Sequence, residues 1–121
     1  ACVTVIGTTN KKSKVLTIPA TLRYKNVAVT VTAIEKNAFK NCKKLKKVTV
    51  GANINSIGKN AFAGDKNLKT ITVQTKNLKK VGAGAFKGIH SKAVIKVPKG
   101  KRKEYQKLFK GKGQKKSVKI K

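Results

Sequence analysis

One stretch of this chain occurs three times in succession: "IEKNAFKNCKKLKKVTV" from residue 34, "IGKNAFAGDKNLKTITV" from residue 57 and "VGAGAFKGIHSKAVIKV" from residue 81. The copies start 23 and then 24 residues apart, and four columns of apolar residues stay in phase. The columns are Ile34, Ile57 and Val81; Phe39, Phe62 and Phe86; Val48, Ile71 and Ile95; and Val50, Val73 and Val97. A unit this short cannot bury its own apolar face, so neighbouring units must stack. The repeat therefore predicts a solenoid.

Each copy contains a segment that alternates like a strand, namely "LKKVTV" (45–50) and "LKTITV" (68–73) in the first two copies. The alternation turns Val48 and Val50 inward and Thr49 outward. Stacked one per turn, these strands would form a parallel sheet along one side of the coil. A second short apolar segment precedes each Phe: "VTAI", "INSI" and "LKKV". We expect the Phe side chains to fill the middle of the coil.

The two ends depart from the repeat, as the caps of a solenoid do. At the start, "VTVIG" and "KVLTIP" are interpreted as two strands joined in a hairpin by "TTNKKS", with a third strand around "NVAVTV". At the other end, residues 99–110 predict a helix with Tyr105, Leu108 and Phe109 on one face, lying over the last coil. "SVKI" predicts a final edge strand.

These features together predict one domain over residues 1–121, with an N-terminal cap at 1–30, three repeats at 31–98 and a C-terminal cap at 99–121. The fold class is an α/β-type repeat solenoid that is mostly β. It is expected to be a short right-handed leucine-rich-repeat coil with a parallel sheet, an N-terminal β cap, and a C-terminal helix and strand.

The repeats "VTAIEKNAFKNCKKLKKVTV", "INSIGKNAFAGDKNLKTITV" and "LKKVGAGAFKGIHSKAVIKVP" resemble those of the BspA-like leucine-rich-repeat proteins of bacterial cell surfaces. The resemblance covers about residues 15–98, and the Lys-rich ending is similar to that of surface members. It implies extracellular or cell-surface location and, in some members, adhesion or protein interaction. It brings no shared catalytic residues. Lys92 stands where the other copies have Leu45 and Leu68, so we expect that coil to be looser near its turn.

The side chains that catalysis needs are few and scattered. Glu35, Asp65 and Glu104 lie at distant points of the repeat, and His90 stands alone in the turn "GIHSK". No glycine-rich phosphate loop follows a strand, and no metal-ligand spacing is present. We therefore expect no enzyme, no cofactor and no metal. Asp65 would accept a hydrogen bond from a turn amide, the ordinary use of Asp in a turn.

The two cysteines, Cys2 and Cys42, are too few to define a disulfide framework. Cys42 occupies the repeat slot of Asp65 and Ile89, and the resemblance implies a packing residue there in preference to a nucleophile. The role of Cys2 is left open. It begins the cap at least one coil from Cys42, so their Cα atoms should exceed the roughly 7 Å limit for a bridge. We predict no disulfide between them.

Charge is the other strong feature: 31 Lys and Arg against 3 Asp and Glu give a formal charge of +28. Such a chain attracts nucleic acid, anionic lipid and acidic polymers. Base-specific recognition favours Arg and exposed aromatic side chains, but only Arg23 and Arg102 are Arg, and the lysines are spread over every turn. Nucleic-acid binding is therefore expected to be non-specific and confined to low salt. Solubility is an equally good explanation of the lysines. No apolar run reaches the roughly 18 residues of a membrane span, and no signal-peptide pattern opens the chain.

Candidate ligand-binding residues fall into two groups. The outward face of the predicted sheet carries little charge, and its candidates are Thr17, Lys47, Thr49, Thr70, Thr72 and Lys96. Lysines that stacking could bring together for polyanion binding are Lys43, Lys44, Lys46, Lys66, Lys69, Lys79 and Lys80, with Lys47 shared between the groups.

The functional hypothesis is a non-catalytic cell-surface domain for protein or polyanion interaction, or adhesion. The alternatives are an intracellular nucleic-acid-binding protein and a purely structural spacer. The sequence names neither a ligand nor an oligomeric state.

Overall fold

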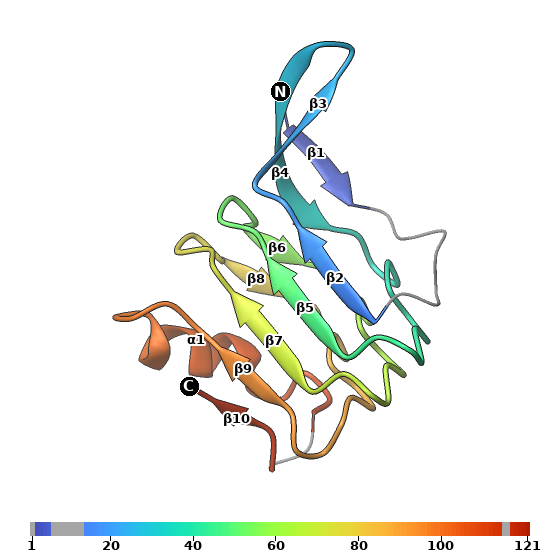
Figure 1. Ribbon diagram of the computed structural model, residues 1–121. Coiled ribbons are helices and arrows are strands. Elements are labelled where there is room, and N and C mark those ends of the chain that lie inside the picture. Colours follow the sequence, from blue (N-terminus) through green and yellow to red (C-terminus); the bar gives the residue numbers. More distant parts are fainter. Residues whose placement is uncertain (1, 6–13, 115–116) are drawn as a thin grey trace.

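The computed structural model describes residues 2–5, 14–114 and 117–121 of the 121-residue chain. Within these residues, short strands wind into a coil with two sheets, and one helix lies near the C-terminal end (Figure 1). Sheet A contains β1 (Cys2–Val5), β4 (Val27–Ile34), β6 (Ser56–Ile57) and β8 (Lys80–Val81), with β3 (Thr21–Tyr24) paired to β4. Sheet B contains β2 (Val15–Ile18), β5 (Lys47–Val50), β7 (Thr70–Val73), β9 (Val94–Lys96) and β10 (Lys119–Ile120).

Sheet B is the parallel sheet that the sequence predicts. Strands β2, β5, β7 and β9 pair in parallel without a shift of register, so that Val48 lies beside Ile71 and Ile71 beside Ile95. These side chains are fully buried, because the alternation of β-branched residues turns every second one inward. One strand per coil, repeated over about four turns, makes the mostly-β solenoid of the prediction.

Sheet A is formed by the second apolar segment of each copy. Ile34, Ile57 and Val81 pair in register across β4, β6 and β8, and all three are buried. The prediction placed a parallel sheet along one side only, whereas the structure has two sheets. The sequence pattern hid the second one because β6 and β8 have two residues each, too few for alternation to be visible.

The phenylalanine column fills the space between the sheets, as predicted. Phe39 and Phe62 stack with ring centroids 5.5 Å apart, and Phe62 and Phe86 stack at 5.6 Å, with rings within 12° and 6° of parallel. All three are almost completely buried. Offset stacking between aromatic rings adds to the burial of their surface, so this column is the centre of the core.

The N-terminal hairpin was predicted in the wrong place. Strand β1 pairs in parallel with β4 in sheet A, whereas β2 pairs in parallel with β5 in sheet B, so the two strands are not a hairpin. The connecting "TTNKKS" lies outside the described residues. The hairpin is instead β3–β4, whose two-residue turn has Lys25 and Asn26 at φ 50° and 65°. Both positive φ values are typical of the tight turns that join antiparallel strands. This hairpin projects from one end of the coil (Figure 1).

The C-terminal helix covers the last coil, as predicted, and is shorter than expected. Helix α1 spans Arg102–Phe109 and not 99–110, because Gly100 has a φ of +87°, which no helix accommodates. Tyr105 and Phe109 are fully buried, and Phe109 continues the aromatic column at 5.4 Å from Phe86. The Tyr105 hydroxyl donates a hydrogen bond of 2.8 Å to the Thr75 carbonyl. It also accepts a hydrogen bond of 3.1 Å from the Leu78 amide.

The chain after α1 returns to the coil. The Phe86 amide donates to the Lys112 carbonyl at 3.0 Å, and β10 then pairs in parallel with β9, which confirms the predicted final strand. In the coil before it, Lys92 is exposed and Ala93 is fully buried. The lysine therefore leaves the inner slot that Leu45 and Leu68 occupy, and the small neighbouring residue takes the core position.

Candidate interaction surfaces

The outer face of sheet B brings together the first group of predicted residues. The parallel register places Thr17, Thr49, Thr72 and Lys96 in one row. A second row contains Val15, Lys47, Thr70 and Val94, followed by Lys119 of β10. Neighbouring strands in a sheet lie about 4.8 Å apart, so each row is a regular ladder of side chains. We call these two rows the sheet B face. Thr49, Thr70 and Thr72 form its uncharged part, and Lys47, Lys96 and Lys119 lie beside or around them.

The second group of predicted residues is divided by the fold. Lys43, Lys44, Lys46, Lys66 and Lys69 lie at the turn that leads into sheet B, where the Lys69 amide donates to the Lys46 carbonyl at 3.0 Å. We call these five the turn lysines; all are exposed. Lys80, by contrast, belongs to β8 in sheet A, and the Lys79 amide donates to the Asn55 carbonyl at 2.8 Å. Lys79 and Lys80 therefore belong to a different surface from the turn lysines.

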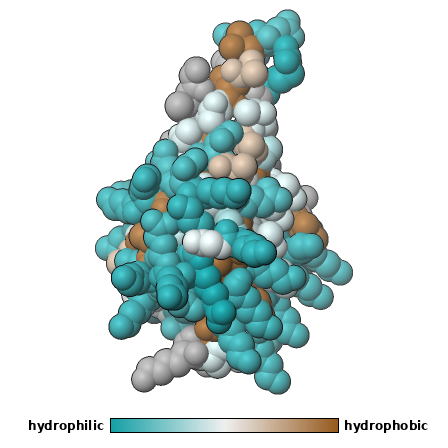
Figure 2. Space-filling model, turned by 90° about the vertical axis from the view of Figure 1, so that its left-hand side faces the viewer, coloured by the Kyte–Doolittle hydropathy of each residue, from teal (hydrophilic) through white to brown (hydrophobic). Residues whose placement is uncertain are grey.

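Most of the positive charge has no carboxylate to meet it. Three acidic residues face 31 basic ones in the sequence. Within the described part of the chain, Lys101 and Glu104 form an ion pair at 3.3 Å at the start of α1. Figure 2 shows hydrophilic side chains over most of one side of the body, with hydrophobic residues near the projecting end. Val27, in the hairpin at that end, is 58% exposed. Long-range attraction of anions is a property of the whole surface.

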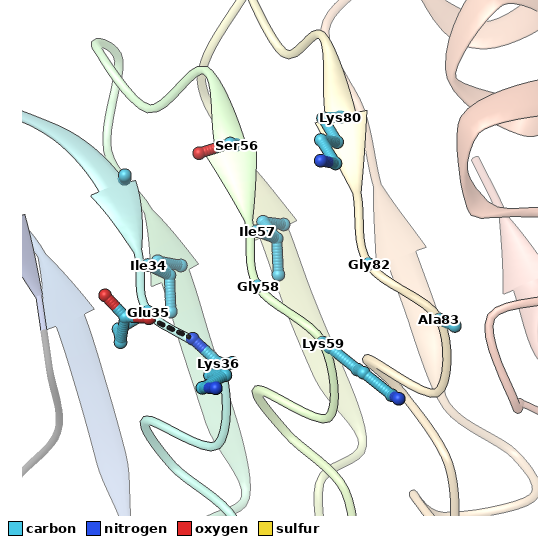
Figure 3. Close-up of a pocket in the computed structure, with 11 residues that line it drawn as sticks. Ile34, Glu35, Lys36, Ser56, Ile57, Gly58, Lys59, Lys80, Gly82 and Ala83 are labelled. Atoms are coloured by element: carbon cyan, nitrogen blue, oxygen red, sulfur yellow. Dashed lines mark hydrogen bonds between the residues drawn. The ribbon is translucent and has the colours of Figure 1, made fainter.

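A groove that the sequence did not predict lies on the sheet A side of the coil, over the ends of β4, β6 and β8 and the residues that follow them. Its volume is about 440 Å³. It extends over three successive coils and has glycines in the middle, as Figure 3 shows. It is lined by Ala33, Ile34, Glu35, Lys36, Ser56, Ile57, Gly58, Lys59, Lys80, Gly82 and Ala83.

The glycines of the groove are required by the stacking of the coils. A Cβ atom added to Gly58 would lie 2.3 Å from the Lys36 amide nitrogen, and one added to Gly82 would lie 2.3 Å from that of Lys59. Backbone cannot move away from such a contact as a flexible side chain could. The column Gly58 and Gly82 was visible in the aligned repeats and is the signal from which the groove could have been found.

Asp65 is fully buried at the turn before sheet B. Its Oδ1 accepts a hydrogen bond of 2.7 Å from the Cys42 amide, as predicted for a turn aspartate. Its Oδ2 is also buried and has no hydrogen-bond partner among the described residues. Burial raises the pKa of Asp65 from 3.8 to about 8, and the bond from the Cys42 amide opposes this shift in part. The carboxyl is therefore mostly protonated at neutral pH.

The remaining candidates for chemistry have structural surroundings. His90 Nδ1 accepts a hydrogen bond of 3.0 Å from the Lys92 amide, which orders the turn. Cys42 is buried at the same level of the coil as Asp65. Among the described residues, no group of three or more His, Cys, Asp and Glu side chains is placed to hold a metal ion. In the same part of the chain, the helix is too short and too polar to cross a membrane.

The stacked coils, their two sheets of mainly parallel strands and the phenylalanine column define a leucine-rich-repeat protein. Residues 15–121 match the family described as the BspA type leucine rich repeat region, in 6 copies, and the chain belongs to this family. Leucine-rich-repeat proteins of this kind are typically non-catalytic and generally mediate protein interactions. A comparison with curated protein sequences gives no match.

Two solved structures share the fold. A leucine rich cell surface protein from Faecalibacterium prausnitzii A2-165 is 26% identical, with a TM-score of 0.58 over 74% of this chain. A leucine-rich repeat protein from Bacteroides ovatus ATCC 8483 is also 26% identical, with a TM-score of 0.53 over 71% of this chain. The matched regions are 31% and 28% of those chains, so the matched part of this chain spans less than a third of their length.

Proposed function

We propose that this domain is a non-catalytic interaction module of a bacterial cell-surface protein, and that it binds a protein partner through the sheet B face. The observation that supports this most directly is the pair of in-register ladders, in which Thr49, Thr70 and Thr72 form an uncharged, partly exposed centre. Repeat proteins commonly bind along an extended face of this kind. The surface location is supported by the similarity to a cell-surface protein and by the family.

The turn lysines suit a supporting role in this function. Exposed ammonium groups speed the approach of an acidic partner or surface, but each exposed ion pair contributes little to affinity. Binding that depends on the sheet B face should therefore persist at 0.15 M salt, where the Debye length is about 8 Å. Attachment that depends on the lysines alone should be much weaker there.

The test is adhesion of beads that carry the domain to proteins of the extracellular matrix at 0.15 M NaCl. The double variant Thr49→Arg with Thr72→Arg changes the centre of the sheet B face. A matched control, Thr21→Arg with Thr32→Arg, adds the same charge on sheet A and its hairpin. We expect the first variant to lose adhesion and the second to retain it.

Two results would contradict the proposal. Equal adhesion of both variants would show that the sheet B face makes no contact, and failure of the unchanged domain to adhere would favour a structural spacer. The nucleic-acid alternative rests on the charge of +28. It would be favoured if the domain bound DNA tightly at 0.15 M NaCl and discriminated among base sequences.

A further inference from the structure

The groove of sheet A has positively charged side chains around small and apolar ones. Lys36, Lys59 and Lys80 are among its lining residues, and all three are exposed. Gly58 and Gly82 lie between them, at positions where the backbones of successive coils pack closely (Figure 3). The lysine side chains could therefore reach a chain that lies in the groove.

The lysines of the groove come from three successive coils. Lys36 and Lys59 belong to neighbouring turns, since the Asn37 amide donates a hydrogen bond of 2.9 Å to the Lys59 carbonyl. Lys80 belongs to the third turn, where β8 pairs with β6. Lys36 and Lys59 lie in one row on adjacent coils, which are about 4.8 Å apart, whereas Lys80 lies in the row of Ala33 and Ser56, three residues earlier along the coil. A chain that crosses the three coils obliquely would therefore meet one lysine per turn. The groove thus matches a linear ligand with closely repeated charges.

Among the described residues that line the groove, Glu35 is the acidic one. It is exposed at one end of the groove, and its Oε1 accepts a hydrogen bond of 3.3 Å from the Lys36 amide. Three ammonium groups against one carboxylate leave a local excess of positive charge. The excess favours an anionic ligand, and Glu35 provides a residue whose neutralisation should strengthen binding.

The lining also limits the class of polyanion. None of the eleven residues is Arg or aromatic. Nucleic-acid bases are usually held by stacking on aromatic rings or guanidinium planes, and an open groove with neither offers no platform for them. The lysine ammonium binds phosphate as a point charge and makes no demand on the geometry of the rest of the ligand. These features favour a slim chain whose phosphates alone are recognised.

We propose that this groove binds a segment of a linear phosphate polymer that crosses the three coils, with its phosphates beside Lys36, Lys59 and Lys80. The site lies on sheet A and is separate from the sheet B face, so it does not depend on the proposed protein partner. It also differs from the turn lysines, which are exposed on another surface. A domain with both sites holds a protein on one sheet and an anionic polymer on the other.

The first experiment uses inorganic polyphosphate of defined length as the probe, with calorimetry at 0.15 M NaCl. The groove variant is Lys36→Gln, Lys59→Gln and Lys80→Gln. The control variant is Lys43→Gln, Lys44→Gln and Lys66→Gln, which removes the same charge from the turn lysines. We expect the groove variant to bind roughly tenfold more weakly, since three exposed ion contacts act together. The control should change affinity roughly threefold or less.

The dependence on salt gives a second measure from the same proteins. Each phosphate neutralised on a flexible chain contributes about 0.7 to the log–log slope of affinity against salt. The groove variant should therefore lower the magnitude of that slope by about two, and the control should lower it by less. Equal losses of affinity and slope in the two variants would overturn the proposal, because they would show that only net charge matters.

Two single variants test the groove in the direction of tighter binding. Glu35→Gln removes the opposing carboxylate, and Ser56→Lys adds an ammonium on the middle coil between Ala33 and Lys80 of the same row. Both should raise the affinity for polyphosphate roughly threefold, whereas the control Thr72→Lys on the sheet B face should have little effect. If neither variant binds polyphosphate more tightly, the proposed site is refuted. This test holds even if the triple variant fails to fold.

The class of ligand is tested with single-stranded DNA and heparin of similar length. We expect both to bind more weakly than polyphosphate and to be less affected by the groove variant. Preferential loss of DNA or heparin binding in that variant would assign the groove to another polyanion and overturn the proposal. Thermal unfolding of each variant shows whether the fold is intact, and these results do not depend on adhesion through the sheet B face.

Discussion

Replacement of Asp65 by asparagine should remove a large part of the dependence of stability on pH. Burial raises the pKa of this carboxyl from 3.8 to about 8 in the folded protein. Between these values the folded state holds a proton that the unfolded chain has lost, so raising the pH favours unfolding. The stabilising contribution is fully present below about pH 4 and is lost as the pH rises through the folded pKa near 8.

The size of this effect follows from proton linkage. One proton taken up by the folded state alone changes the free energy of unfolding by about 1.4 kcal/mol per pH unit. Between pH 5 and pH 7 the unchanged protein should therefore lose on the order of 2–3 kcal/mol through Asp65. Asp65→Asn keeps an oxygen to accept from the Cys42 amide and cannot titrate. The contributions of all other groups are common to both proteins.

The assay is urea unfolding at several pH values between 4 and 8, followed by far-ultraviolet circular dichroism at constant ionic strength. The chain has no Trp, so backbone signal is the natural choice. The quantity to compare is how the difference in unfolding free energy between the two proteins changes with pH. The buried amide of the variant lowers its stability by an amount that does not vary with pH, so this cost does not affect the comparison. Parallel stability curves for the two proteins would refute the reasoning, since they would mean that Asp65 is ionised in the folded state.

Three further predictions concern the core, the cap and the charge. Phe62→Ala removes the middle ring of the aromatic column and should cost about 3–5 kcal/mol in urea unfolding; a loss below 1 kcal/mol would contradict the packing. Tyr105→Phe leaves two buried backbone groups without the hydroxyl and should cost about 1–3 kcal/mol; an unchanged unfolding midpoint would exclude this role for the hydroxyl. The melting temperature should rise with NaCl, because the Debye length shrinks from about 30 Å at 0.01 M to about 8 Å at 0.15 M; a fall over that range would show that repulsion among lysines is unimportant.

The parts of the fold that could be predicted are those that repeat in the sequence. The column of Phe39, Phe62 and Phe86 recurs in phase, and its rings stack as expected. The sheet B face also follows from the repeat, because the alternation in each strand fixes which residues turn outward. A helix with Tyr105 and Phe109 on one face needed only its own periodicity. In all these cases the evidence is local or strictly periodic.

The features that the sequence did not predict depend on which segments lie side by side, and the alternation within one strand does not specify that. A strand pattern in Cys2–Val5 and Val15–Ile18 is the same whether the strands pair with each other or with separate sheets. The groove on sheet A depends on how three successive coils stack, and the glycines at 58 and 82 that permit this stacking also suggest ordinary turns. Asp65 was expected at a hydrogen-bonded turn, but its complete burial depends on the coils on either side.

The repeat explains why the two faces of this coil can differ in chemistry. Inner positions must match from coil to coil, because Ile34, Ile57 and Val81 pack against one another. Outer positions have no such constraint: the row that contains Ala33 and Ser56 in its first two coils has Lys80 in the third. Binding properties must therefore come from the outward residues that break the repeat. On sheet B those positions remain rich in Thr and Val. On sheet A the third coil has Lys80, beside a groove that Lys36 and Lys59 also line. This difference supports separate ligands for the two sheets.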